Sequence, residues 1–171
     1  MAHLSGILVA GGVSDVIVVS RPGDEELELE VARLGARVRT VPNPHAEQGQ
    51  LSSLLAALDA ADRPGVHALL VTPVDAPYVR DHTVAALLSA FATRGVPLVR
   101  ATRRGRHGHP VVFGRAVFDA LRHADARLGA KAVVQAHGHE AIDVEVDDDG
   151  VLDDIDRPED YDRAVGNAPK K

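Results

Sequence analysis

The carboxylate of Asp75 is the side chain best placed for chemistry, because it follows a short apolar run and stands between two prolines. Residues 68–71 read Ala-Leu-Leu-Val, which is typical of a strand buried on both faces of a parallel sheet. Pro73 and Pro77 stiffen the segment that follows. Ligands of doubly wound α/β folds bind beyond the carboxyl ends of the strands. We therefore expect Asp75 to line the main cleft at the end of a central parallel strand. It would be a Mg²⁺ ligand there, or else an ordinary turn aspartate.

Two other segments carry groups suited to ligand binding. Residues 49–53, Gly-Gln-Leu-Ser-Ser, open a predicted helix whose first N–H groups are free to meet an acceptor-rich ligand. Residues 103–109, Arg-Arg-Gly-Arg-His-Gly-His, are predicted to form a basic loop. First-turn serines and basic surface loops are also common as purely structural features. The pairs His107/His109 and His137/His139 do not by themselves supply the four ligands of a zinc site.

The elements that must position these groups alternate along the chain. Apolar runs predict strands near residues 16–19, 37–41, 68–71, 97–101, 110–113 and 141–146. Helical patterns follow Asp24, Gly49 and Asp81, with shorter ones at 115–121 and 130–135. This alternation predicts an α/β fold with a mostly parallel sheet and helices on both faces. We expect a single domain over residues 1–171, with a flexible tail at 166–171.

Composition narrows the classes of partner. The 171 residues are 45% hydrophobic, and the net charge of −6 argues against binding to nucleic acid or acidic membranes. The sequence has no cysteine, so thiolate chemistry and disulfides are excluded. No apolar run approaches ~18 residues, and no secretory signal opens the chain. The sequence therefore predicts a cytoplasmic protein.

Several segments together resemble the molybdenum cofactor cytidylyltransferase-like (MobA-like NTP transferase) family. The resemblance runs from about Val13 to Tyr161. It is carried by these stretches: NPHAEQGQLSSLLAAL (43–58), VTPVDAPYV (71–79), RGRHGHPVVFGRAVFDAL (104–121), RLGAKAVV (127–134) and LDDIDRPEDY (152–161). Each motif is weak alone, but their order and spacing are fairly specific to this group.

The resemblance implies a three-layer αβα Rossmann-like fold of the nucleotide-diphospho-sugar transferase type. It also implies transfer of a nucleotidyl group from CTP or another NTP to a phosphorylated acceptor, such as a molybdopterin-type cofactor, with Mg²⁺ as cofactor. Asp75 and His109 would be catalytic, and Asp75 and Asp156 would hold the metal. The residues implied at the nucleobase and at the acceptor are Gly49, Gln50, Ser52, Ser53, Arg106, His107 and Gly108. Capping of a last helix is the alternative role of Asp156.

The sequence departs from the family at its start. Members begin with a strand and a glycine-rich loop, Gly-x-x-x-Arg-Met-Gly-x-x-Lys, which cradles the triphosphate. Here Gly11-Gly12 leads at once into the strand at Val16, and the only lysines are Lys131, Lys170 and Lys171. We therefore expect weakened transfer, and a non-catalytic binding or regulatory relative is the alternative.

Residues 4–12 fit either the end of the family's first helix or a strand, and the helix is slightly favoured. The connection from Gly11 to Asp15 is too short for a parallel crossover, so a strand here would run antiparallel to the next. In either case a central strand, or its usual direction, is lost. Residues 6–10 could fold back into the vacant position, or a second copy could fill it in a homodimer. Either remedy would bury Ile7, Leu8 and Val9.

Overall fold

The computed structural model describes residues 1–152, so Asp156 and the tail at 166–171 lie outside the described residues. The strands are β1 (Val16–Ser20), β2 (Val38–Pro42), β3 (Ala68–Val71), β4 (Leu98–Arg103), β5 (Arg106–Gly114) and β6 (Ile142–Glu145). The α-helices are α1 (Ala2–Ala10), α2 (Glu25–Ala32), α3 (Gln50–Ala61), α4 (Asp81–Arg94), α5 (Phe118–Arg122) and α6 (Ala130–Ala136). Short 3₁₀ turns are η1 (Ala46–Gln48), η2 (Arg115–Val117), η3 (Gly138–Glu140) and η4 (Asp149–Val151).

Local sequence explains the limits of several helices. The Asp24 side chain caps α2 by accepting a hydrogen bond from the Leu27 N–H at 3.2 Å. Glutamates follow in the first turn, where negative charge suits the helix dipole. Gly95 ends α4 in the left-handed conformation, which glycine adopts without a steric penalty. These boundaries agree with the sequence prediction.

The strands form a mixed arrangement in two hydrogen-bonded groups. Strands β1 and β2 pair in parallel, and the second group has the order β3-β5-β4-β6. Strand β5 pairs antiparallel with both β3 and β4, whereas β4 and β6 are parallel. The expectation of a central parallel strand before Asp75 was therefore wrong in detail, because β3 is the edge of its group and its neighbour β5 is antiparallel.

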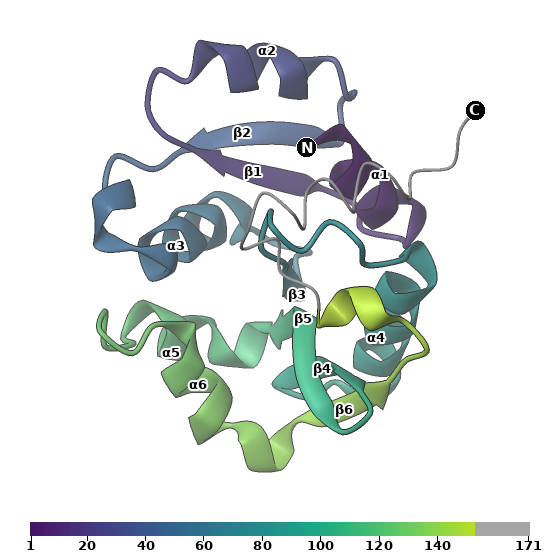
Figure 1. The fold of residues 1–171 in the computed structure, drawn as a ribbon. Coiled ribbons are helices and arrows are strands. Elements are labelled where there is room, and N and C mark those ends of the chain that lie inside the picture. Colours follow the sequence, from purple (N-terminus) through teal and green to yellow (C-terminus); the bar gives the residue numbers. More distant parts are fainter. Residues whose placement is uncertain (153–171) are drawn as a thin grey trace, which may run out of the picture.

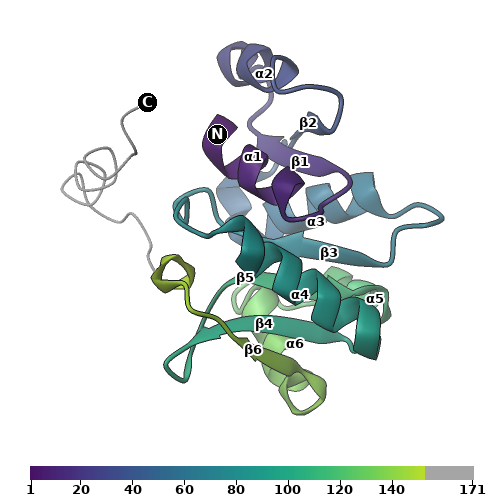
Figure 2. The ribbon, with the colours of Figure 1, turned by 90° about the vertical axis from the view of Figure 1, so that its right-hand side faces the viewer.

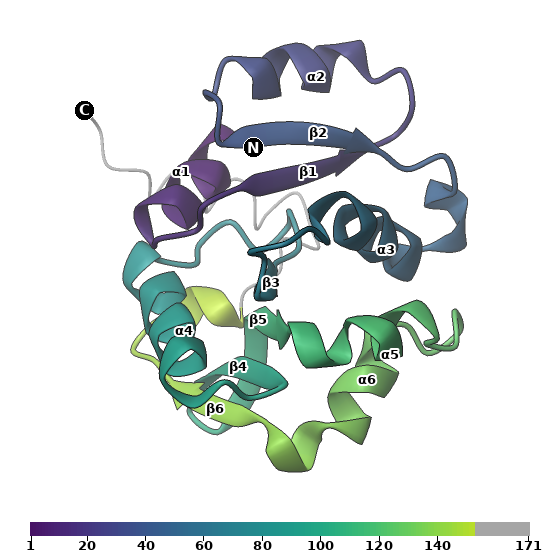
Figure 3. The ribbon, with the colours of Figure 1, turned by 180° about the vertical axis from the view of Figure 1, so that it is seen from behind.

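Helices cover both faces of the strands. Helices α1 and α4 lie on one side, and α3, α5 and α6 lie on the other (Figures 1 and 3). Figure 2 looks onto the side formed by α1 and α4. The first side buries Leu4, Leu8, Val84 and Leu87, and the second buries Leu54, Leu58, Val117, Phe118 and Leu121. The three layers predicted from the alternation of strands and helices are present.

The N-terminal segment is a helix, as the favoured interpretation held. Helix α1 buries Leu4, Ser5 and Leu8, while Ile7 and Val9 are half-buried. Residues 6–10 therefore do not fold back as a strand, and Leu8 alone of residues 7–9 is fully buried. Among the described residues no strand lies between β1 and β3. We call the space between the facing edges of these two strands the slot (Figure 1).

Within residues 1–152, none of the helices is both long enough and apolar enough to cross a membrane.

Candidate active site

The loop that follows β3 carries three buried polar atoms that have no hydrogen-bond partner among residues 1–152. They are Thr72 Oγ1, Asp75 Oδ1 and Tyr78 Oη. A buried polar group without a partner costs free energy, and an ionised carboxylate costs the most. The combination fits a loop whose partners come from a bound ligand. A divalent cation bound here would be the positively charged partner that Asp75 Oδ1 lacks.

The start of α3 is fastened to the preceding loop by Asn43, a residue that the sequence analysis did not single out. The buried Asn43 amide donates to Ser52 Oγ at 2.8 Å and to Ser53 Oγ at 3.1 Å, and its backbone N–H donates to Ser20 O. Ser52 Oγ in turn lies 2.8 Å from the His45 and Gly49 carbonyl oxygens. The sequence signals at Asn43 were its position between Pro42 and Pro44 and its place at the start of the family-like stretch 43–58. The Ser52 hydroxyl is thus engaged in holding this loop.

The segment predicted as a basic loop is a β-hairpin. Thr102 pairs with His107 and Arg103 with Arg106, so Arg106 to His109 begin β5 instead of lying in a loop. Arg104 and Gly105 make the turn, both with positive φ. The hairpin fixes alternate side chains on opposite faces, which a loop would not do.

A short ionic chain holds one side of this hairpin. Arg100 donates from Nε and Nη2 to the Asp143 carboxylate at 2.7 and 3.0 Å, and His107 Nε2 lies 3.1 Å from Asp143 Oδ2. Burial alone would raise the pKa of Asp143, but the bonds from Arg100 and His107 outweigh it and lower the pKa. His107 is therefore tied to a structural carboxylate.

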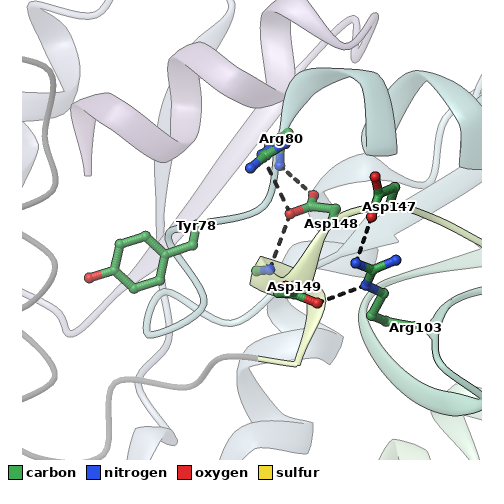
Figure 4. Close-up of a pocket in the computed structure, with 7 residues that line it drawn as sticks. Tyr78, Arg80, Arg103, Asp147, Asp148 and Asp149 are labelled. Carbon is green, nitrogen blue, oxygen red and sulfur yellow. Dashed lines mark hydrogen bonds and ion pairs between the residues drawn. The ribbon is translucent and has the colours of Figure 1, made fainter.

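A polar cluster beside the turn of the hairpin joins three distant segments (Figure 4). The buried Asp148 carboxylate accepts hydrogen bonds from the Arg80 N–H and Thr83 Oγ1, at 2.8 and 2.7 Å, and from the Gly150 N–H at 3.1 Å. Arg103 pairs with the exposed Asp147 and Asp149. These groups satisfy one another, so we interpret the cluster as a structural clasp between the start of α4, the hairpin and η4.

A cavity of about 1770 Å³ brings most of the candidate residues together. Its lining includes these sequence-predicted residues: Gln50, Ser53, Asp75, Arg106, His107, Gly108 and His109. Gly49 and Ser52 are not part of the lining. Asp156 lies outside the described residues, and residues 1–152 contain no group of three or more His, Cys, Asp or Glu side chains that could hold a metal.

The structure adds a cation that the sequence analysis had noted only as one of three lysines. Lys131, in the first turn of α6, lines the same cavity. Three of the arginines in the lining are paired: Arg63 with Asp15, Arg100 with Asp143, and Arg115 with Asp62. Arg106 and Lys131 have no ion pair among the described residues, and both are exposed. They are the cations of this cavity that remain free to meet a phosphate.

The profile of the MobA-like NTP transferase domain matches residues 1–141. The chain belongs to this family. Phosphoenolpyruvate guanylyltransferase from Sphaerobacter thermophilus is 30% identical over 168 residues, which cover 98% of this chain and 77% of that protein. The comparison thus confirms the family predicted from the motifs.

Solved structures confirm the fold. Rv0371c from Mycobacterium tuberculosis aligns with a TM-score of 0.78 at 21% identity, over 97% of this chain and 83% of that one. A manganese complex of Rv0371c aligns with a TM-score of 0.74, over 96% and 84% of the two chains, also at 21% identity. A nucleotidyl transferase from Methanothermobacter thermautotroptrophicus reaches 0.74 at 24% identity, over 95% and 76%. The chain has the nucleotide-diphospho-sugar transferase fold.

Proposed function

We propose that this chain transfers a nucleotidyl group from a nucleoside triphosphate to a small phosphorylated acceptor. The observation that carries the proposal is the buried, unpartnered Asp75 Oδ1, which lines one cavity together with the start of α3 and the start of β5. An oxygen of the acceptor's phosphate would attack the α-phosphorus, and the bond to the β-phosphate oxygen would break, releasing pyrophosphate. Such chemistry needs mainly positioning and neutralisation of charge.

Asp75 is the residue among 1–152 that we assign to Mg²⁺, since its orphaned oxygen fits a hard cation. The ion would neutralise phosphate charge and orient the triphosphate. Asp156, which the family resemblance implies as a second ligand, remains part of the proposal. Gln50 and Ser53, at the first turn of α3, are assigned to the nucleotide's base side, where helix N–H groups are available.

The acceptor side is assigned to β5 and α6. Arg106 and Lys131 are unpaired cations at the cavity and suit a phosphate monoester. His109, which also lines the cavity, is the proposed catalytic partner of Asp75. The relative that uses phosphoenolpyruvate favours that acceptor with GTP, and the family resemblance favours a pterin phosphate with CTP. Either acceptor presents the phosphate that these cations would bind.

We expect turnover to be slow. A triphosphate leaving water needs several N–H donors and cations in exchange for its hydration. Arg106 and Lys131 are the two unpaired cations that the described part of the cavity offers, and both stand on its acceptor side. This count also supports the second candidate function, a protein that binds a nucleotide without transferring it.

The test measures binding and pyrophosphate release with GTP, CTP, ATP and UTP, with and without Mg²⁺, and with phosphoenolpyruvate or a pterin phosphate as acceptor. Asp75→Asn should weaken Mg²⁺-dependent binding by about 10- to 100-fold, since it removes the charge that meets the metal. The matched control is Asp81→Asn, which changes an exposed carboxylate at the start of α4.

Binding that needs Mg²⁺ and Asp75, with measurable pyrophosphate release, supports the transferase. Binding without release for any acceptor supports the binding protein. If no nucleotide binds at millimolar concentration, or if Asp75→Asn and Asp81→Asn bind alike, the assignment of this cavity to a nucleotide is wrong.

A further inference from the structure

Asn43 joins the end of β1 to the loop that leads from β2 to α3 (Figure 1). Its side chain is 2% exposed, and its backbone N–H donates to Ser20 O at 2.8 Å. A buried side-chain amide needs partners for its carbonyl oxygen and for the two hydrogens of its nitrogen. In Asn43 each of these groups has a partner, and the partners determine how the neighbouring serines are polarised.

The His45 N–H fixes which way the Asn43 amide points. A backbone N–H can only donate, and this one lies 2.9 Å from Asn43 Oδ1. The amide nitrogen therefore faces α3, where its two hydrogens meet Ser52 Oγ at 2.8 Å and Ser53 Oγ at 3.1 Å. Both serine oxygens accept from Asn43, so each serine keeps its own hydroxyl hydrogen for a different partner.

Ser52 uses its hydroxyl hydrogen within the chain. Its oxygen lies 2.8 Å from the carbonyl oxygens of His45 and Gly49, which can only accept. The Ser52 O–H therefore donates to one of these carbonyl groups. The loop thus satisfies Ser52 completely.

Ser53 differs from Ser52 because it lines the cavity and has no carbonyl partner. Among residues 1–152 its oxygen is bonded to Asn43 Nδ2 alone, so its O–H has no acceptor in this part of the chain. A ligand that displaces solvent from this hydroxyl has to accept its hydrogen in exchange. A group that only donates would use the remaining lone pair and leave the O–H unmet, which is the costlier loss.

The bond from Asn43 also makes this donor stronger and fixes it in advance. An N–H that donates to a hydroxyl oxygen polarises the O–H, so the hydroxyl donates more strongly to the next group. The Asn43 amide cannot turn over without losing its bonds to His45, Ser52 and Ser53. Ser53 is therefore set as a donor before any ligand arrives.

We propose that Asn43 is a positioning residue for the nucleotide base, and that through it Ser53 selects a base with a carbonyl oxygen. This inference rests on the proposed function, in which the first turn of α3 meets the base. Guanine, cytosine and uracil each carry a carbonyl oxygen, whereas adenine carries an amino group and no carbonyl. The carbonyl oxygen accepts the Ser53 O–H, and the amino group of adenine cannot. The site therefore disfavours adenine nucleotides.

The experiment compares the binding of inosine triphosphate (ITP) and ATP to the full chain with Mg²⁺, by isothermal titration calorimetry. Position 6 of the purine carries a carbonyl oxygen in ITP and an amino group in ATP. ITP should bind about tenfold more tightly, the worth of roughly one hydrogen bond. Ser53→Ala should weaken ITP binding about tenfold, change ATP binding little and so abolish the preference. The matched control, Ser89→Ala at an exposed position of α4, should keep it.

Asn43→Asp separates a positioning role from a purely structural one. Aspartate has the shape of asparagine, but it accepts where Nδ2 donated, so the Ser53 O–H turns toward the carboxylate. Ser53 then offers a ligand only lone pairs, which suit the amino group of ATP. The preference for ITP over ATP should fall from tenfold to one or below. The added negative charge acts on both nucleotides and cancels in this ratio.

A purely structural Asn43 would give a different result. Asn43→Asp would then weaken ITP and ATP by the same factor and leave the tenfold preference in place, which would overturn the proposal. Should this variant not fold, nuclear magnetic resonance of the unmodified chain decides. The side-chain N–H signals of Asn43 should stay protected from exchange when ITP binds, since the ligand takes the Ser53 O–H and not the bonds from Asn43. Rapid exchange of these signals in the ITP complex would overturn the proposal.

The same titrations separate this inference from the proposed function. If nucleotides bind in a manner that needs Mg²⁺ and Asp75, but ITP and ATP bind equally, the proposed function stands and the role of Asn43 and Ser53 is wrong. If no nucleotide binds, both are wrong.

Discussion

At the scale of single residues, Asp148 is the carboxylate that does most to join distant parts of the chain. It is 2% exposed and accepts hydrogen bonds from Arg80, Thr83 and Gly150. Asp148→Ala would leave these donors without their acceptor, and we expect a loss of about 2–4 kcal/mol in the free energy of unfolding. Urea denaturation of the variant and the unmodified chain measures this loss in the free energy of unfolding. Asp147→Ala, which alters a carboxylate that is 92% exposed, should cost no more than about 1 kcal/mol. Equal losses would contradict the clasp.

Acid should loosen the β4–β5 hairpin. The Arg104 N–H donates to Glu145 at 2.6 Å and lowers its pKa from the ordinary 4.5, and the bond from Arg103 lowers the pKa of Asp149 from 3.8. The folded state therefore binds fewer protons than the unfolded one. Its stability is constant above about pH 4.5 and falls as the pH drops through the lowered values.

Hydrogen exchange of residues 103–106 at pH 6, 4.5 and 3 measures this loosening. The double variant Glu145→Gln, Asp149→Asn removes these two titrating groups and leaves Asp143 in place, so exchange in its hairpin should depend less on pH than exchange in the unmodified hairpin. An unmodified hairpin that stays protected at pH 3 would contradict the expectation.

Asp75 shows what could be read from the sequence at this scale. An apolar run followed by an aspartate between prolines predicted a side chain at the cavity, and the structure places Asp75 there. The role of Ser52 could not be predicted, because it depends on Asn43, nine residues away, and on carbonyl oxygens of a loop whose path the sequence does not reveal. Its role at a nucleobase stays a prediction.

At the scale of elements, two glycines allow β5, η4 and the segment before α4 to approach closely. A Cβ on Gly108 would collide with the Val151 carbonyl group, and one on Gly150 with that of Tyr78. Gly108→Ala should therefore lower the free energy of unfolding by about 1–3 kcal/mol or more, because backbone atoms cannot yield as a side chain can.

The matched substitution is Gly6→Ala in α1, where the added Cβ would have no atom within 4 Å. Because alanine has a higher helix propensity than glycine, this variant should raise the free energy of unfolding by about 0.5–1 kcal/mol. Thermal melts of the two variants should move in opposite directions. A neutral Gly108→Ala would mean that η4 does not press on β5.

Elements were predictable where local signals decide them and less so where pairing decides them. The cap at Asp24 and the stop at Gly95 place α2 and α4 from sequence alone. Arg106 to His109 were predicted as a loop because glycine and basic residues are poor strand formers. They extend instead because β4 lies alongside and pairs with them, a contact that local composition does not encode.

At the scale of the whole molecule, the sequence predicted a vacant strand position but did not decide whether residues 6–10 would fill it. The departure from the family's opening strand and glycine-rich loop predicted that a central strand, or its usual direction, is lost. Whether residues 6–10 would fill the vacancy depended on the competition between a strand in the slot and a helix on α4. The helix prevails because Leu4 and Leu8 join the core there, and because Gly11 has no side chain: a Cβ on Gly11 would lie only 2.5 Å from Val84 Cβ.

Helix α1 should therefore stabilise the whole molecule although it lies at the end of the described chain. Burial of Leu4 and Leu8 is worth about 1.5–3 kcal/mol each, so deletion of residues 1–10 should lower the melting temperature by about 10 °C.

Deletion would also open one face of the slot, and the exposed apolar surface should favour self-association. The double variant Leu4→Ala, Leu8→Ala should reproduce most of the loss, and His3→Ala, at an exposed position of the same helix, should not. Calorimetry and light scattering measure both effects. If the deletion leaves the melting temperature and the mass in solution unchanged, the packing of Leu4 and Leu8 does not stabilise the fold, and the competition argued here did not decide the form of residues 1–10.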